Sequence, residues 1–279
     1  MSWTFGGAAS NDMNWATQTS VGGANTAFLV CGWWRPTTLT NPRSYFSFGN
    51  VITARVAPTT SEIQLVSDNA TTDGVWTTSG AGIAVNNWYF LAALGIFTTA
   101  DAIWRVWKST GVDNPPAGIT VTTPPTTAPS GNNAGSGTFY LGNAGTSTAN
   151  SFQGQIGSCS LYSVTSATVP NPLRLTSYTA LSVDEEEFIR REYVVPAWLG
   201  EPFPGVGNHS VYGGTPPTWQ MHHFDLEQVV TPRPFVWGNS TFSPTGTAAT
   251  IQGATFSQER PPVVAGARNT NPFPGFRRR

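Results

Sequence analysis

Short runs of apolar and aromatic residues, separated by turn residues, are the feature that most constrains how this chain can fold. Ten such runs lie between residues 27 and 162, and they are rich in β-branched or aromatic residues and bounded by Gly, Pro, Asn or Asp. The runs are Ala27–Trp34, Ser44–Phe48, Val51–Val56, Glu62–Val66, Val75–Thr78, Trp88–Leu94, Ile103–Lys108, Gly118–Thr122, Phe139–Leu141 and Gln155–Tyr162. Because no helical stretch lies between them, they predict an all-β chain folded as an antiparallel sandwich or barrel.

Composition limits the classes of partner that this chain can be expected to have. Aromatic residues make up 12% of the 279 residues and charged residues only 10%. Both values argue against disorder, because disordered chains are typically poor in aromatic residues and highly charged. A net charge of −1 gives no reason to expect binding to nucleic acid or to an anionic membrane. The longest apolar stretches are also shorter than the ~20 residues that a membrane-spanning helix needs.

The N-terminus and the cysteines indicate the compartment of synthesis. Residues Met1–Phe5 show no basic region followed by an apolar one, so we expect no secretory signal and synthesis in a cytoplasm. Cys31 and Cys159 lie inside apolar strand-like runs, and two cysteines in so long a chain do not form a disulfide framework. We therefore expect both to be buried, reduced thiols.

One segment has a helical rather than a β pattern. Ser182 precedes Glu185 by three residues, which is a capping box, and the acidic first turn is followed by Arg190 and Arg191. Pro196 ends the segment. The run of carboxylates is better explained as a solvated helix start than as a metal or acid–base site, because consecutive helical residues point in different directions.

The chain divides by composition near residue 195. Residues 196–279 carry 12 of the 22 prolines and only three strand-like fragments, at Thr218–Leu226, Pro234–Trp237 and Ala248–Phe256. We predict one domain over residues 1–195 and an extended, Pro-rich C-terminal arm over residues 196–279. From residue 260 onward the arm contains five arginines and no acid.

The order of motifs along the chain resembles a known family. An apolar strand ends in Trp33-Trp34-Arg35-Pro36, Asn87-Trp88-Tyr89 follows, Phe152-Gln153-Gly154-Gln155-Ile156 leads to Tyr162, and Leu181-Ser182 opens the acidic helix. This set resembles the laminin-G-like or pentraxin-like branch of the concanavalin A-like jelly rolls, over roughly residues 3–193. The resemblance implies a two-sheet jelly roll with one short helix; the arm lies outside it.

The residues that catalysis needs are sparse. A glycan hydrolase needs two carboxyl groups about 5–10 Å apart, whereas the acids before the helix are isolated near turns: Asp12, Glu62, Asp68, Asp73, Asp101 and Asp113. The histidines all lie in the arm, and the adjacent pair His222 and His223 would point to opposite faces of a strand. We expect no enzyme, no metal site and no cofactor. The family resemblance implies calcium as the one exception, at Asp68, Asp73 or Asp101.

The tryptophans have two interpretations. Trp33, Trp34, Trp88, Trp104 and Trp107 are expected to fill the space between two sheets. Trp15 and Trp76 have polar neighbours in the sequence, which makes them candidates for stacking against a glycan.

Two functions follow from these features. The small polar composition, the low lysine content and the jelly-roll motifs resemble structural proteins of tailed bacteriophages, which implies a capsid decoration or cement protein, located in the virion. Its partners would be the major capsid protein or other copies of itself, as a homo-oligomer. We expect the assembly interface to use aromatic and arginine residues of the arm: Trp219, Trp237, Arg260, Arg268, Phe273, Phe276, Arg277, Arg278 and Arg279. The alternative is a carbohydrate-binding, lectin-like module of a phage fibre or surface protein, and a depolymerase is a third reading.

Overall fold

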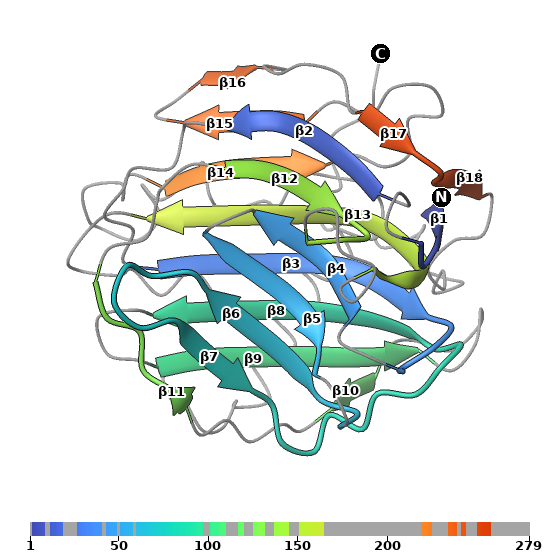
Figure 1. Ribbon diagram of the computed structural model, residues 1–279, viewed down its shortest axis with the longest axis horizontal. Helices are drawn as coiled ribbons and strands as arrows, with labels where there is room; N and C mark the ends of the chain where they lie inside the picture. The colour runs from blue at the N-terminus through green and yellow to red at the C-terminus, as the bar shows by residue number, and fades with distance from the viewer. Residues whose placement is uncertain are drawn as a thin grey trace, which may run out of the picture.

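The computed structural model describes the strands of the chain and the turns next to them (Figure 1). The described residues are 2–8, 12–18, 27–40, 43–48, 51–57, 60–96, 101–109, 117–119, 125–131, 137–144, 151–164, 219–224, 234–238, 241–243 and 250–257. Within these ranges there is no α-helix, so none is long and apolar enough to cross a membrane. The helix expected at Ser182 lies outside the described residues.

The strands form two sheets, called A and B, in which every pair of neighbouring strands is antiparallel. Sheet A has ten strands: β1 (Ser2–Gly6), β3 (Ala27–Pro36), β8 (Trp88–Ile96), β9 (Asp101–Ser109), β10 (Ala117–Ile119), β13 (Gln153–Val164), β14 (Trp219–Phe224), β15 (Pro234–Gly238), β16 (Thr241–Ser243) and β18 (Thr255–Ser257). Sheet B has eight: β2 (Asp12–Gln18), β4 (Arg43–Phe48), β5 (Ile52–Val56), β6 (Ile63–Ser67), β7 (Gly74–Thr77), β11 (Pro125–Thr127), β12 (Gly137–Leu141) and β17 (Thr250–Gln252).

The two sheets lie face to face, and in Figure 1 the strands of sheet B cross in front of those of sheet A. The order in sheet A is β10-β9-β8-β3-β13-β14-β15-β16, with β1 paired to β13 and β18. The order in sheet B is β11-β7-β6-β5-β4-β12-β2-β17. This arrangement confirms the predicted all-β, antiparallel two-sheet jelly roll.

Each predicted strand run overlaps a strand of the structure, and four further strands are present. The strands β1, β2, β11 and β16 fall outside the predicted runs. The sequence of residues 123–133, with Pro124, Pro125 and Pro129 among threonines, predicts a long exposed loop that cannot be a central strand. The structure instead places the edge strand β11 within these residues. Pro125 and Thr127 pair with β7 at the edge of sheet B. Proline is tolerated in an edge strand because its missing N–H removes no hydrogen bond between two central strands.

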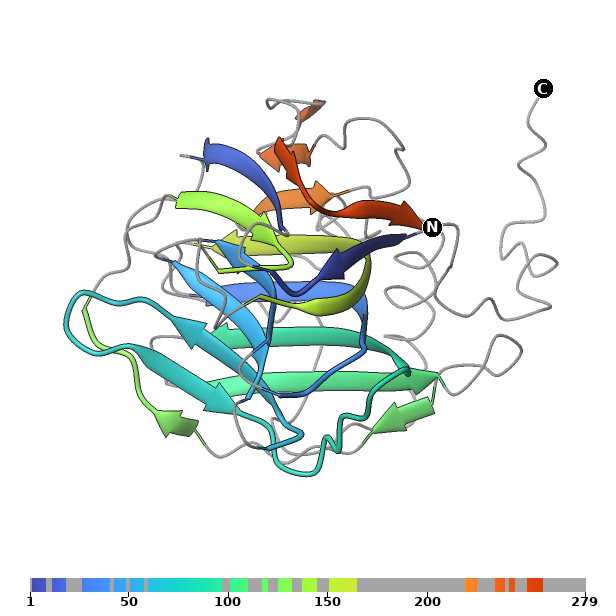
Figure 2. The same ribbon diagram turned by 45° about the vertical axis from the view of Figure 1, so that its right-hand side comes forward.

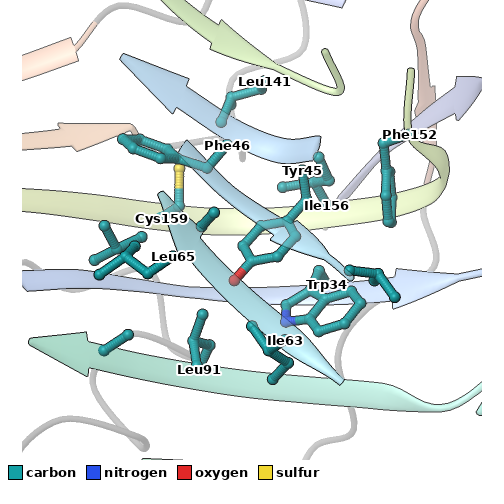
Figure 3. Packing of buried hydrophobic residues seen from close by; sticks show 14 of the residues in the cluster. Trp34, Tyr45, Phe46, Ile63, Leu65, Leu91, Leu141, Phe152, Ile156 and Cys159 are labelled. Carbon is teal, nitrogen blue, oxygen red and sulfur yellow. The ribbon is translucent and has the colours of Figure 1, made fainter. Parts of the chain in front are cut away.

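The main core fills the space between the sheets (Figure 3). Buried and half-buried residues alternate along β5 and β6, as a sheet with one covered face requires. The ring of Trp34 stacks on Tyr45 with centroids 4.7 Å apart and an interplanar angle of 5°. On sheet B, Phe48 stacks on Phe139 with centroids 4.3 Å apart. These rings account for much of the apolar area removed from water.

Not all the tryptophans expected in this core belong to it. Trp34 does, but Trp33 and Trp88 are buried without being part of the cluster between the sheets. Trp33 packs instead on Phe90, with ring centroids 5.3 Å apart, on the opposite side of sheet A. The expectation for Trp33 and Trp88 is therefore wrong, because adjacent strand residues alternate between faces. The side chains of Trp104 and Trp107 lie outside the described residues.

Strands from the predicted arm are hydrogen-bonded to the rest of the sandwich. β14 pairs with β13 in sheet A, β17 with β2 in sheet B, and β18 with β1 in sheet A. Figure 2 shows β17 and β18 beside these N-terminal strands. The edge of the Trp3 ring contacts Phe256, and Ala254 belongs to the core. The division of the chain at residue 195 stays a prediction, but residues 250–257 complete both sheets.

The thiol expectation is confirmed for one cysteine. Cys159 is buried in the core and forms no disulfide, and burial raises the pKa of its thiol well above the usual range. The side chain of Cys31 is outside the described residues.

Candidate binding face of sheet B

The outer face of sheet B carries a continuous row of side chains that crosses six strands. Residues that are Cα partners on neighbouring strands make up this central row, in the order Asn14, Tyr140, Ser47, Thr53, Val66 and Val75. Five interstrand spacings of about 4.8 Å give the row a length of about 24 Å. The row begins with amide, phenol and hydroxyl groups and ends with two valines.

The residues next to these in each strand show which way the side chains of the row point. Ile52, Ala54, Leu65 and Trp76 belong to the core between the sheets. Because alternate strand residues point to opposite faces, the residues between them point outward. Most of the central row is half-buried, whereas Ser47 is nearly covered. We call this outer surface the polar face.

A second row lies beside the central row and is linked by hydrogen bonds. Arg55, Gln64 and Thr77 are Cα partners on β5, β6 and β7. The Arg55 Nε–H donates to Gln64 Oε1 at 2.9 Å, and Gln64 Nε2 donates to Thr77 Oγ1 at 3.1 Å. In the central row, the hydroxyls of Ser47 and Thr53 share a hydrogen bond of 3.0 Å. These cross-strand bonds already restrict the rotamers of the side chains on this face. Less side-chain entropy would then be lost when a ligand binds there.

Two ionisable groups on this face are affected by burial. Desolvation lowers the pKa of the Arg55 guanidinium. At the end near β17, Asp12 is only 2% exposed, and desolvation raises the pKa of its carboxyl although the Asn14 amide donates to Asp12 Oδ1 at 2.8 Å. The face therefore holds a cation on the central strand β5 and a buried carboxyl at its β2 end.

The groups on the polar face are suited to binding. Amide, guanidinium and hydroxyl groups supply both donors and acceptors, and the Tyr140 ring adds a half-exposed aromatic surface. A chain of hydroxyl groups, as in a glycan, offers donors and acceptors at a similarly regular spacing.

Acidic residues of the loops act as structural hydrogen-bond acceptors. Glu62 accepts bonds from Thr78 Oγ1 at 2.6 Å, from the Gly80 N–H at 2.9 Å and from the Ala81 N–H at 3.0 Å, which fixes the loop after β7. Asp73 Oδ1 accepts from the Asn69 N–H at 3.1 Å. In the part of the chain that the structure describes, no three His, Cys, Asp or Glu residues gather as metal ligands. The calcium expectation gains no support from Asp68 and Asp73; the side chain of Asp101 is not described.

The structure corrects the predicted glycan-stacking residues. Trp15 is 0% exposed and Trp76 is 1% exposed, and both belong to the core. Neither ring can stack against a ligand at the surface. Their polar sequence neighbours are the outward residues of the same strands, including Asn14 on the polar face. In a sheet with one buried and one solvent-exposed face, a core residue is thus expected to have polar neighbours in the sequence.

The predicted assembly residues are not placed by the structure. Trp219 pairs with Val164 and Trp237 pairs with Met221 and Phe242 through the backbone, but their side chains are not described. The remaining members lie outside the described residues: Arg260, Arg268, Phe273, Phe276, Arg277, Arg278 and Arg279. The assembly interface stays a prediction.

Part of the polar face could have been found in the sequence. The alternation in Ile52–Val56 and Ile63–Ser67 places Thr53, Arg55 and Gln64 on one face. The row itself joins Asn14, Tyr140 and Ser47, which are far apart in the sequence, so it follows only from the strand order.

Comparisons with known proteins return distant structural similarity. No protein-family model matches the chain, and no curated protein matches its sequence. A heptameric SAP-like pentraxin from Limulus polyphemus is 14% identical with a TM-score of 0.38, covering 57% of this chain and 74% of its own. A protein from Bacteroides ovatus assigned to carbohydrate binding is 9% identical with a TM-score of 0.43, covering 86% and 60%. Domains LG4-5 of the mouse laminin alpha1 chain are 13% identical with a TM-score of 0.35, covering 58% and 40%.

These values are too low to carry information on ligands or partners. This chain spans less than two thirds of the Bacteroides and laminin chains.

Proposed function

We propose that this protein is a non-catalytic binding protein that holds a glycan chain along the polar face of sheet B. The observation that carries the proposal is the central row, in which amide, phenol and hydroxyl side chains lie in register from β2 to β5. The polar part of the row spans three interstrand spacings, or about 14 Å, which matches an extended ligand of a few sugar units better than a compact one. Attachment to a virion is a separate proposal, which rests on the small polar composition, the low lysine content and the jelly-roll motifs, with the arginine-rich residues 260–279 as the expected interface.

A polar outer face is also what any solvated antiparallel sheet requires. Three features distinguish this one. Its side chains are mostly half-buried, they are joined to one another by hydrogen bonds of 2.9 to 3.1 Å, and they include an aromatic ring. Such a surface is partly ordered before the ligand arrives, which lowers the entropy cost of binding.

Substitutions in the central row test the proposal. Tyr140→Ala removes the half-exposed ring, and Thr53→Val removes a hydroxyl while keeping the side-chain volume. We expect each to weaken binding to a responsive polysaccharide, found in a panel of neutral and acidic chains, by at least about fivefold, as for a residue contributing more than about 1 kcal/mol. Calorimetric titration gives the affinity.

The matched control is Thr38→Val, on the loop that follows β3. Thr38 bonds the Thr40 hydroxyl at 2.9 Å and lies outside the polar face. This variant should bind like the wild type. Equal affinities for all four proteins, or no binding to any polysaccharide in the panel, would contradict the proposed site.

A further inference from the structure

Arg55 occupies a defined place next to the central row. It lies two residues along β5 from Thr53, on the same face, and is the Cα partner of Ser44 on β4 and of Gln64 on β6. Two strand residues span about 6.7 Å. A ligand lying on the central row therefore passes within reach of the guanidinium group.

The hydrogen-bond relay through Gln64 sets the orientation of this guanidinium. Arginine has donors only, so the Gln64 oxygen must face Arg55, and its amide nitrogen then faces Thr77. The Nε side of Arg55 is occupied by Gln64. Among the described residues nothing else hydrogen-bonds to this guanidinium, so the fork of its two terminal nitrogens is left for a ligand.

The charge of Arg55 has no counter-ion within the described part of the chain. No carboxylate there forms an ion pair with it, and desolvation is the cause that lowers its pKa. The group nevertheless stays protonated, because arginine titrates far above neutral pH. A half-buried cation without an anion is a costly arrangement, which a bound anion relieves.

We infer that Arg55 selects acidic glycans, by binding the carboxylate of a uronic acid residue in the chain that lies on the polar face. This inference rests on the proposed function and names the ligand class of the same site. The planar fork of a guanidinium matches the two oxygens of a carboxylate, which favours a uronic acid over a neutral sugar.

A matched pair of ligands tests the inference on the full chain. Polygalacturonic acid and its carboxyl-reduced, neutral form have the same backbone and differ at the acid group. We expect the wild type to bind the acidic form at least about tenfold more tightly, a difference of about 1.4 kcal/mol. Raising the salt from 50 to 200 mM should narrow the difference. Dextran sulfate distinguishes a sulfate preference from a carboxylate preference.

Two variants separate the charge from the fold. Arg55→Gln removes the cation. Gln64→Glu keeps Arg55 but places a carboxylate where the amide oxygen now lies 2.9 Å from Nε, so that the protein supplies its own counter-ion. Both variants should bring the ratio of the affinities for the acidic and the neutral form close to one, whatever change each causes in the affinity for the neutral form. Thermal melting verifies that each is folded.

The outcomes distinguish the two proposals. If the wild type binds both forms equally, or if the acid preference survives in both variants, the role of Arg55 is overturned and the glycan-binding face stands. Tighter binding of dextran sulfate than of polygalacturonic acid overturns the carboxylate assignment. If neither form of the polysaccharide binds, the proposed function fails for this glycan backbone and the inference fails with it.

Discussion

The two outer faces of this sandwich have opposite chemistry, although both belong to antiparallel sheets of the same molecule. On sheet A, Trp33 and Phe90 point away from the core between the sheets and are still only 1% and 0% exposed. On sheet B, the equivalent surface is the polar face, with half-buried Thr53, Arg55 and Gln64. Trp33 and Phe90 on the outer face of sheet A are thus covered, whereas Thr53, Arg55 and Gln64 on the outer face of sheet B remain partly exposed.

The contrast shows where function can be sought in a chain of this kind. An apolar outer surface that is already covered contributes to stability, because removing apolar surface from water is the dominant favourable term in folding. A polar surface whose groups are hydrogen-bonded to each other contributes little to stability. Solvation alone accounts for polar side chains on such a face, and the proposed binding accounts for their mutual hydrogen bonds and partial burial.

The largest expected effect is a loss of stability when the covered outer face of sheet A is disrupted. Replacing Trp33 with Ala should lower the free energy of unfolding by about 3–5 kcal/mol, since the ring is buried against Phe90. Val66→Ala, at an outward and half-buried position of sheet B, should cost less than about 1 kcal/mol. Urea denaturation of both variants measures the difference. Similar losses would mean that the two outer faces are not different in kind.

A smaller effect concerns the buried carboxyl at the end of the polar face. Burial raises the pKa of Asp12 in the folded state, so the folded protein holds this proton more tightly than the unfolded chain does. The contribution of Asp12 to stability is therefore most favourable below about pH 4 and falls as the pH rises through the raised pKa.

The variant Asp12→Asn keeps an acceptor for Asn14 but cannot ionise. Its urea midpoint at pH 7 should lie above that of the wild type, and the gap should close toward pH 3.5. A gap that widens toward acid pH would show that the ionised carboxylate is stabilised in the fold.

The last prediction concerns the reactivity of Cys159 in the unmodified protein, and it needs no substitution. Because Cys159 is buried in the core and its thiol pKa is raised, it should not react with a maleimide in the native protein at pH 7. Mass spectrometry of the peptide containing Cys159 should show labelling after unfolding in urea. Rapid labelling of the native protein would indicate that the space between the sheets opens readily.

Local pattern was enough to predict the class of fold, and it failed where faces had to be assigned. The alternation in β5 and β6 predicted strands that the structure contains. β2 was missed because Asp12, Asn14 and Gln18 are poor β-formers, although Met13 and Trp15 between them are buried. The prediction for Trp15 is wrong because it relies on the polar residues next to Trp15 in the sequence. In a strand, those neighbours point to the opposite face of the sheet from the Trp15 ring.

The candidate site depends on pairings that local sequence does not contain. Tyr140 becomes a neighbour of Asn14 and Ser47 only because β12 lies between β2 and β4. By contrast, the uninterrupted apolar runs Ala27–Trp34 and Trp88–Leu94 are the pattern expected of strands that are covered on both faces, so this property of sheet A could be predicted from the sequence. Strand order is a property of the whole chain, which is why the binding face emerged from the structure.

The pairing of the two ends of the chain also has a consequence for how the protein is made. Ser2 is the Cα partner of Ser257, so β1 cannot acquire its neighbour β18 until nearly the whole chain has been synthesised. At about 5–20 residues per second, the ribosome needs roughly 13 to 50 seconds to reach that point. During this time the side of β1 that β18 will occupy, beside Trp3, stays unpaired. Contacts of such long sequence separation slow folding, and an open strand edge invites pairing with another nascent chain. We therefore expect the yield of native protein to depend on chaperones and on the rate of synthesis.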